Sequence, residues 1–154
     1  MLVLKVEAPP FSINKAHYRN GNRTQACRKW GDDILEQLRE YKADMDEFST
    51  AYKERVHTHS LEVELIFEQP HRTMFKTSGS DRGKLSRRGC DLSNIEKMLI
   101  DLVFDLRFSK RGWDNLALDD TLIATLTSKK RKSPNSKSYI TIIITEIRNT
   151  NLLP

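Results

Sequence analysis

The sequence has few of the features that mark secreted, membrane or zinc-binding proteins. Its only two cysteines, Cys27 and Cys90, form no recognisable pattern, which indicates free thiols in a reducing compartment. These cysteines and the four histidines lack the spacing of a zinc site. Apolar runs such as 140–144 are far shorter than the roughly 20 residues that cross a bilayer, and residues 1–7 are interrupted by charge too soon for a signal peptide. We therefore expect a soluble, cytoplasmic protein without a membrane partner.

Aromatic residues and the motifs of nucleotide-dependent enzymes are scarce as well. Only 8% of the residues are aromatic, and many of them fall on one predicted helix. Modules that bind single-stranded nucleic acid stack bases on aromatic side chains, so the composition disfavours that class. No P-loop, dinucleotide-binding fingerprint or nucleophile elbow occurs.

Positive charge is abundant and unevenly distributed. The 154 residues suit one domain, with a net charge of +5. Residues 69–88 hold six lysines and arginines against one aspartate, and residues 129–137 hold no acid. We expect both segments to be flexible basic loops that contact phosphates, although residues 129–132 also fit a solvated hairpin tip. The expected DNA-contacting residues are Arg72, Lys76, Arg82, Lys84, Arg87, Arg88, Lys129, Lys130, Arg131 and Lys132.

Hydrophobic periodicity predicts an α+β domain with a mixed sheet and two main helices. Strands are predicted at 2–6, 61–68, 121–127 and 139–147, and helices at 24–55 and 92–107, in the order β-α-β-α-β-β. The whole chain, 1–154, is expected to be a single domain. Residues 31–55 carry eight acidic and four basic side chains, so the first helix is not expected to face DNA.

Acidic residues around the second predicted helix are candidates for a metal site. Asp91 stands at the start of that helix, and Asn94, Lys97 and Asp101 follow at spacings that share one helical face. The pair Asp119-Asp120 begins the next predicted strand. Carboxylates that hold a hard divalent cation can activate water for phosphodiester hydrolysis, and Lys97 would stabilise the charge that develops on the phosphate.

These elements resemble, in order and over nearly the whole chain, the RusA family of Holliday-junction resolvases. The matching stretches are Pro9-Pro10-Phe11-Ser12-Ile13-Asn14 with Tyr18, the run from Asp91 through Asn94 and Lys97 to Asp101, and Asp119-Asp120. The resemblance implies a homodimer, often of phage origin, that cuts branched DNA (four-way junctions) symmetrically with Mg²⁺, for which Mn²⁺ can substitute.

The resemblance also implies roles for individual residues. Asp91 and Asp120 match the family's catalytic metal-binding acids, and Lys97 matches its catalytic lysine. Asp119 would be a further metal ligand, while Asn94 and Asp101 match motif positions around the site. Ser93 departs from the family, which has a second aspartate there, and a neutral hydroxyl is a poorer ligand for a hard cation.

Other interpretations of the same residues remain open. Asp91 is a favourable helix N-cap, and Ser93 followed by Glu96 fits a capping box. Lys97 and Asp101 fit an ordinary surface ion pair, and Asp119-Asp120 fits a turn before a strand. The alternative to an active nuclease is a branched-DNA-binding protein that kept the fold but cleaves weakly or not at all.

Overall fold

A computed structural model describes residues 1–9, 24–86, 92–105 and 114–152, without the side chains of Ser93 and Asn94. The elements are β1 (Leu2–Glu7), α1 (Gln25–Leu38), η2 (Arg39–Tyr41), α2 (Lys42–Lys53), β2 (His59–Gln69), α3 (His71–Met74), α4 (Leu92–Phe104), η3 (Asp120–Leu122), β3 (Ile123–Lys132), β4 (Tyr139–Arg148) and η4 (Asn149–Leu152), where η denotes a 3-10 helix. No helix in these ranges is long and apolar enough to cross a membrane.

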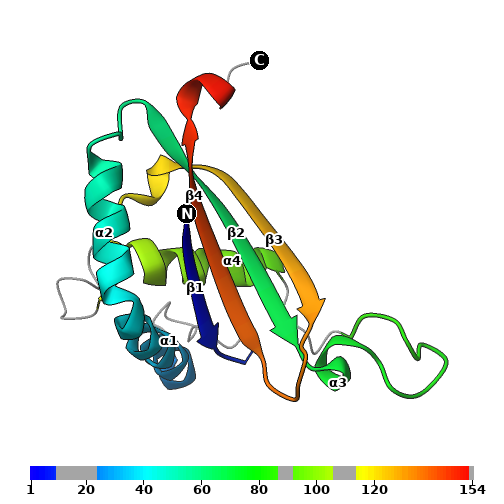
Figure 1. Ribbon diagram of the computed structural model, residues 1–154. Coiled ribbons are helices and arrows are strands. Elements are labelled where there is room, and N and C mark those ends of the chain that lie inside the picture. The colour runs from blue at the N-terminus through cyan, green and yellow to red at the C-terminus, as the bar shows by residue number, and fades with distance from the viewer. Residues whose placement is uncertain (10–23, 87–91, 106–113, 153–154) are drawn as a thin grey trace.

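The four strands form one mixed sheet in the order β1-β4-β2-β3 (Figure 1). β1 and β2 both pair with β4 in antiparallel orientation, whereas β2 and β3 are parallel. The predicted α+β class, the mixed sheet and the order of the main elements are confirmed.

One face of the sheet is buried because its strands alternate apolar and polar residues. The inward residues of the three strands that supply most of this face are Leu2, Leu4, Val6, Leu61, Val63, Leu65, Phe67, Ile140, Ile142 and Ile144. Figure 1 shows α4 crossing behind the sheet and α1 and α2 along the side where β1 lies. The side chains of these helices join the same hydrophobic core.

α4 is apolar around most of its circumference because it lies between the sheet and α1. Cys27 Sγ of α1 lies 3.9 Å from Met98 Sδ of α4. One turn further along, a Cβ atom at Gly31 would lie 3.2 Å from a methyl group of Leu102, so the glycine allows close packing of the two helices. The burial of α4 fixes where its two ends lie relative to the sheet.

The predicted helix at 24–55 is in fact two helices. The 3-10 turn Arg39–Tyr41 separates α1 from α2. In this turn the Tyr41 hydroxyl donates to the carbonyl of Lys5 and accepts from its N–H, at 3.0 and 3.3 Å. The apolar stripe continues across the break, from Leu38 to Met45, which explains why periodicity alone predicted one helix.

Two loop predictions also differ from the structure. β3 continues through Lys132, so four of the basic residues expected in the 129–137 turn belong to an edge strand, whose charged side chains reach water. Gln69 belongs to β2, and the following residues form α3 and an isolated bridge between Phe75 and Leu85. Long basic stretches resemble loops in composition, but backbone pairing with a neighbouring strand decides their structure.

The free edge of β1 provides a test of how the fold is stabilised. Gln37 bonds both backbone groups of Glu7, each at 2.7 Å. We expect Gln37→Ala to lower the free energy of unfolding by about 1–2 kcal/mol, because two edge groups lose their partner. Urea unfolding would measure the loss. Glu40→Ala, at an exposed position nearby, is the control, and equal effects of both variants would contradict this role.

Candidate nucleic-acid interface

Residues 71–86, which we call the basic arm, project from the end of β2 (Figure 1). The arm folds back on itself through paired backbone hydrogen bonds. Lys76 N–H donates to Lys84 C=O at 2.9 Å, and Ser86 N–H donates to Met74 C=O at 2.8 Å. Gly79 and Gly83 have φ values of 82° and 88°, which suit glycine at the turn. The arm therefore has a defined backbone.

Asp81, the only acid of the arm, binds two of its cations. Its carboxylate oxygens lie 3.3 Å from Lys76 Nζ and 3.0 Å from Lys84 Nζ. Arg72 and Arg82 are exposed and form no ion pair within the described ranges. Two guanidinium groups of the arm thus remain available to an external anion, and the two lysines share one counter-charge.

The end of β3 brings a second set of cations to the same end of the sheet. Gln69, the last residue of β2, is in register with Lys132, the last residue of β3. Ser133 N–H also donates to Gln69 C=O at 2.8 Å. The basic arm begins two residues after Gln69 and therefore starts beside the end of β3, although the two basic segments are more than 40 residues apart in the chain.

The cations of β3 are divided between the two faces of the sheet. Lys130 is in register with Phe67 and points to the helix-covered face, where it is half-buried. Lys129 and Arg131 point to the opposite face, and Lys129 Nζ lies 3.0 Å from the Glu64 carboxylate. The basic residues therefore surround the end of the sheet instead of forming a single loop tip.

Lys97 of α4 is exposed, as a phosphate-contacting residue must be. Residues 94, 97 and 101 lie within one helix, and their spacing gives them a common face, as predicted. Lys97 forms no ion pair with Asp101 or with any other described acid, while half-buried Asp101 has other interactions. The simple surface ion pair between Lys97 and Asp101 is therefore not formed.

The acidic pair Asp119-Asp120 is exposed and stands at the start of η3, the 3-10 helix that leads into β3. Asp119 caps η3: its Oδ1 accepts from Thr121 N–H at 2.9 Å. This bond and a further one from the Thr121 side chain hold the pKa of Asp119 below its ordinary value. At least one of the two acids thus has a structural role, as the turn interpretation predicted.

The segment that leads to the acidic pair is attached to the last turn of α4. The Asn115 side-chain amide donates to the carbonyls of Leu102 and Asp105 at 3.1 and 2.8 Å, and Leu116 N–H donates to Val103 C=O at 2.9 Å. Asp91 precedes the opposite end of this helix. Its own position, like those of Arg87 and Arg88, lies outside the described residues.

The described acids do not form a metal site by themselves. No group of three or more His, Cys, Asp or Glu side chains suited to a metal ion occurs within the described ranges. Asp120 also precedes the start of β3, whereas Lys132 ends it, and a strand of this length spans about 30 Å. Carboxylates are suitable Mg²⁺ ligands, but a site here would need Asp91 as well.

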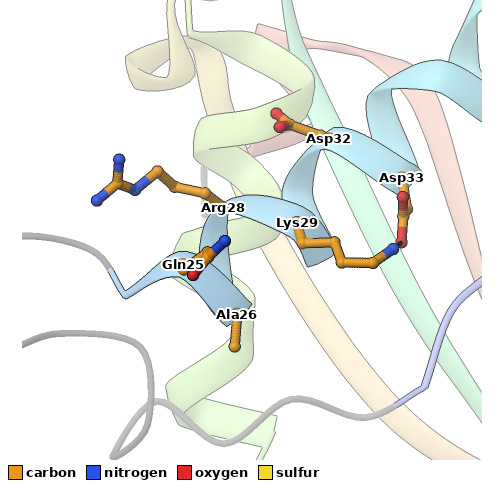
Figure 2. Close-up of a pocket in the computed structure, with 6 residues that line it drawn as sticks. All are labelled: Gln25, Ala26, Arg28, Lys29, Asp32 and Asp33. Carbon is orange, nitrogen blue, oxygen red and sulfur yellow. Dashed lines mark hydrogen bonds and ion pairs between the residues drawn. The ribbon is translucent and has the colours of Figure 1, made fainter.

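A shallow depression at the start of α1 was not expected from the sequence (Figure 2). The described residues that line it all come from this helix: Gln25, Ala26, Arg28, Lys29, Asp32 and Asp33. Figure 2 shows Lys29 extending along the helix to Asp33, and the two charges are 2.9 Å apart. This pairing raises the pKa of Lys29. The lining shows no arrangement of a nucleophile with a base.

Comparison with known proteins adds no assignment. No protein-family model matches the chain, and no curated protein matches it significantly. The ion pairs of Asp81 with Lys84 and Lys76 were not predicted from the sequence. The two lysines are only three and five residues from Asp81, which is close enough to have suggested these pairs.

The cap on η3 leads to a prediction about pH. We expect Asp119→Ala to lower the thermal midpoint at pH 7, because Thr121 loses its acceptor. The folded-state pKa of Asp119 is lowered, so its stabilisation is present above the unfolded pKa of about 3.9 and disappears as pH falls through the folded value. Circular-dichroism melts at several pH values between 7 and 2 would measure this. Asp120→Ala is the matched control, and a loss independent of pH would contradict the prediction.

Proposed function

We propose that the chain binds branched DNA through the basic end of its sheet and cleaves it as a homodimeric, metal-dependent endonuclease that resembles the RusA resolvases. The supporting observation is the juxtaposition of the basic arm with the end of β3. Both segments were expected from the sequence to contact phosphates. Gln69, the last residue of β2 before the arm, is paired with Lys132, the last residue of β3.

The charge distribution supports DNA binding at this end of the molecule. Residues 71–86 and 129–137 together carry nine lysines and arginines and one acid, so the remainder of the chain has a net negative charge. Residues 31–55, from the middle of α1 to just past the end of α2, hold much of that negative charge, with a net charge of −4. Cations concentrated in one place release counterions from a polyanion more effectively than scattered ones do.

The arm and β3 would contribute differently to binding. The exposed guanidinium groups of Arg72 and Arg82 can each contact a phosphate with two donors. Lys76 and Lys84 would exchange Asp81 for phosphate, which lowers the net gain from those contacts. Contacts of these side chains with DNA phosphates position the DNA without reading its sequence, as expected for recognition of a branched shape.

Cleavage would depend on Asp91 and Asp120 as ligands of Mg²⁺ and on Lys97 as a charge near the phosphate. Bound Mg²⁺ would supply activation of the attacking water. Support comes from the exposed, unpaired ammonium group of Lys97 and from the exposed carboxylate of Asp120. Because the described acids do not assemble a site alone, the cleavage part of the proposal rests on Asp91.

A second candidate function is binding of branched DNA without efficient cleavage. Two observations favour it: Ser93 replaces an aspartate of the family motif, and Asp119 is engaged in capping η3. A site that depends on fewer carboxylates holds a hard cation more weakly.

Binding can be tested through its salt dependence. We expect the double variant Arg82→Gln, Arg131→Gln to weaken junction binding and to reduce the slope of log K against log salt by about two, one for each lost phosphate contact. Fluorescence anisotropy with a labelled four-way junction would measure both quantities. Lys53→Gln on α2 is the control, because it removes a cation far from the proposed interface. An unchanged slope in the double variant would exclude these contacts.

Cleavage needs a separate assay, a gel of junction products with and without Mg²⁺ or Mn²⁺. We expect metal-dependent cutting that Asp91→Asn or Asp120→Asn reduces by several orders of magnitude while binding is retained. Ser93→Asp should increase cutting, since it adds a negative ligand. If the wild-type chain binds junctions without cutting them and Ser93→Asp begins to cut, the second candidate is correct.

A further inference from the structure

The side chain of Asp81 connects the two sides of the basic arm. Lys76 lies on the outgoing side and Lys84 on the returning side. Lys76 N–H donates to Lys84 C=O, and Gly83 N–H donates to Lys76 C=O, both at 2.9 Å. One carboxylate oxygen of Asp81 lies 3.3 Å from Lys76 Nζ, and the other lies 3.0 Å from Lys84 Nζ. The paired backbone therefore holds two ammonium groups around a single anion.

This arrangement is that of an anion site whose present occupant can be exchanged. A carboxylate with one ammonium group at each oxygen matches a phosphodiester group, which also offers two oxygens and one negative charge. The side chains of Lys76, Asp81 and Lys84 are 40%, 47% and 73% exposed, so an anion can reach the pair from water. Ion pairs this exposed add little stability, so the backbone bonds of the arm can persist when Asp81 leaves.

We propose that Lys76 and Lys84 form a phosphate-binding site that Asp81 occupies until DNA displaces it, so that Asp81 competes with DNA phosphates. The ligand in this inference rests on the proposed function, whereas the site itself is argued from the geometry of the arm. Asp81 is the only acid among residues 71–86, which hold four lysines and arginines.

The competition makes binding by the arm depend on the local density of phosphates. Displacement of Asp81 by one phosphate exchanges one ion contact for a similar one and gains little. Two phosphates that approach together attract the lysine pair more strongly, and strands converge in this way at a branch. Asp81 therefore weakens binding to plain duplex more than binding to a junction. Arg72 and Arg82 have no such competitor within the described ranges and attract both forms of DNA.

Removal of the charge of Asp81 tests the competition. We expect Asp81→Asn to bind duplex DNA about two- to fivefold more tightly, the effect of an exposed ion pair. The slope of log K against log salt should steepen by up to about one, because the arm then neutralises one more phosphate. Junction affinity should rise less, so the preference for junctions falls. Fluorescence anisotropy with a four-way junction and a duplex of the same arm sequence would measure both.

Asp33→Asn on α1 is the matched control. Asp33 pairs with Lys29 at 2.9 Å, so this variant also frees one lysine and changes the net charge equally, on the far side of the sheet from the arm (Figure 1). It should leave both affinities close to those of the wild type. Equal effects of the two variants would show a general effect of charge and overturn the competition.

Two further variants separate competition from folding of the arm. Asp81→Glu keeps the charge and should keep the wild-type salt slope. In a chain that carries Lys76→Gln and Lys84→Gln, Asp81→Asn should change DNA affinity little, because no lysine pair is left to release. A gain of the same size in that background overturns the proposal.

Amide hydrogen exchange at Lys76 and Ser86, whose N–H groups bond across the arm, would report its folding. We expect these amides to stay protected in Asp81→Asn. Weaker DNA binding by this variant together with loss of protection would assign Asp81 to folding of the arm and overturn the competition. Equal gains on junction and duplex would overturn its role in selectivity.

The outcomes also separate this inference from the proposed function. If the wild type binds junctions and Asp81→Asn behaves like Asp33→Asn, the competition is wrong and the proposed function stands. If the wild type does not prefer junctions but Asp81→Asn tightens duplex binding through Lys76 and Lys84, the competition is correct and the branched-DNA function is wrong. If no variant binds DNA, both are wrong.

Discussion

The arrangement of the molecule depends on the burial of α4 against one face of the four-stranded sheet. Its apolar surface needs cover on two sides, which the sheet and α1 provide, and the close approach at Gly31 shows how tightly they pack. The two ends of α4 are therefore fixed in position relative to the sheet. The segment before η3 is attached at one end through Asn115 and Leu116, while the chain from the basic arm enters at the other.

The strand β3 separates acidic and basic residues that are close together in the sequence. Asp119-Asp120 precedes β3 and the basic residues end it, so acidic and basic groups lie toward opposite ends of the strand. The basic end joins the arm because β2 and β3 are parallel and finish in register. The positive surface thus results from strand pairing, and the acidic pair lies outside it.

Much of the fold could be predicted because hydrophobic periodicity depends on local geometry. Alternation in β1, β2 and β4, together with the apolar run of α4, indicated each element to within a few residues. The break at Arg39–Tyr41 could not be predicted from that pattern, since it coincides with contacts between Tyr41 and a strand more than 30 residues away. The extension of β3 through four basic residues likewise depends on pairing with β2, which composition does not reveal.

For the candidate site, the sequence by itself determined which residues could carry chemistry and that Lys97 shares a helical face with positions 94 and 101. Charge composition also determined the two basic segments. Only the tertiary structure decided that these segments meet, that Asp119 caps η3, and that β3 extends through Lys132, away from the acidic pair. Spacing along a chain specifies neighbours within a helix or strand, whereas proximity between elements is set by how their apolar faces pack.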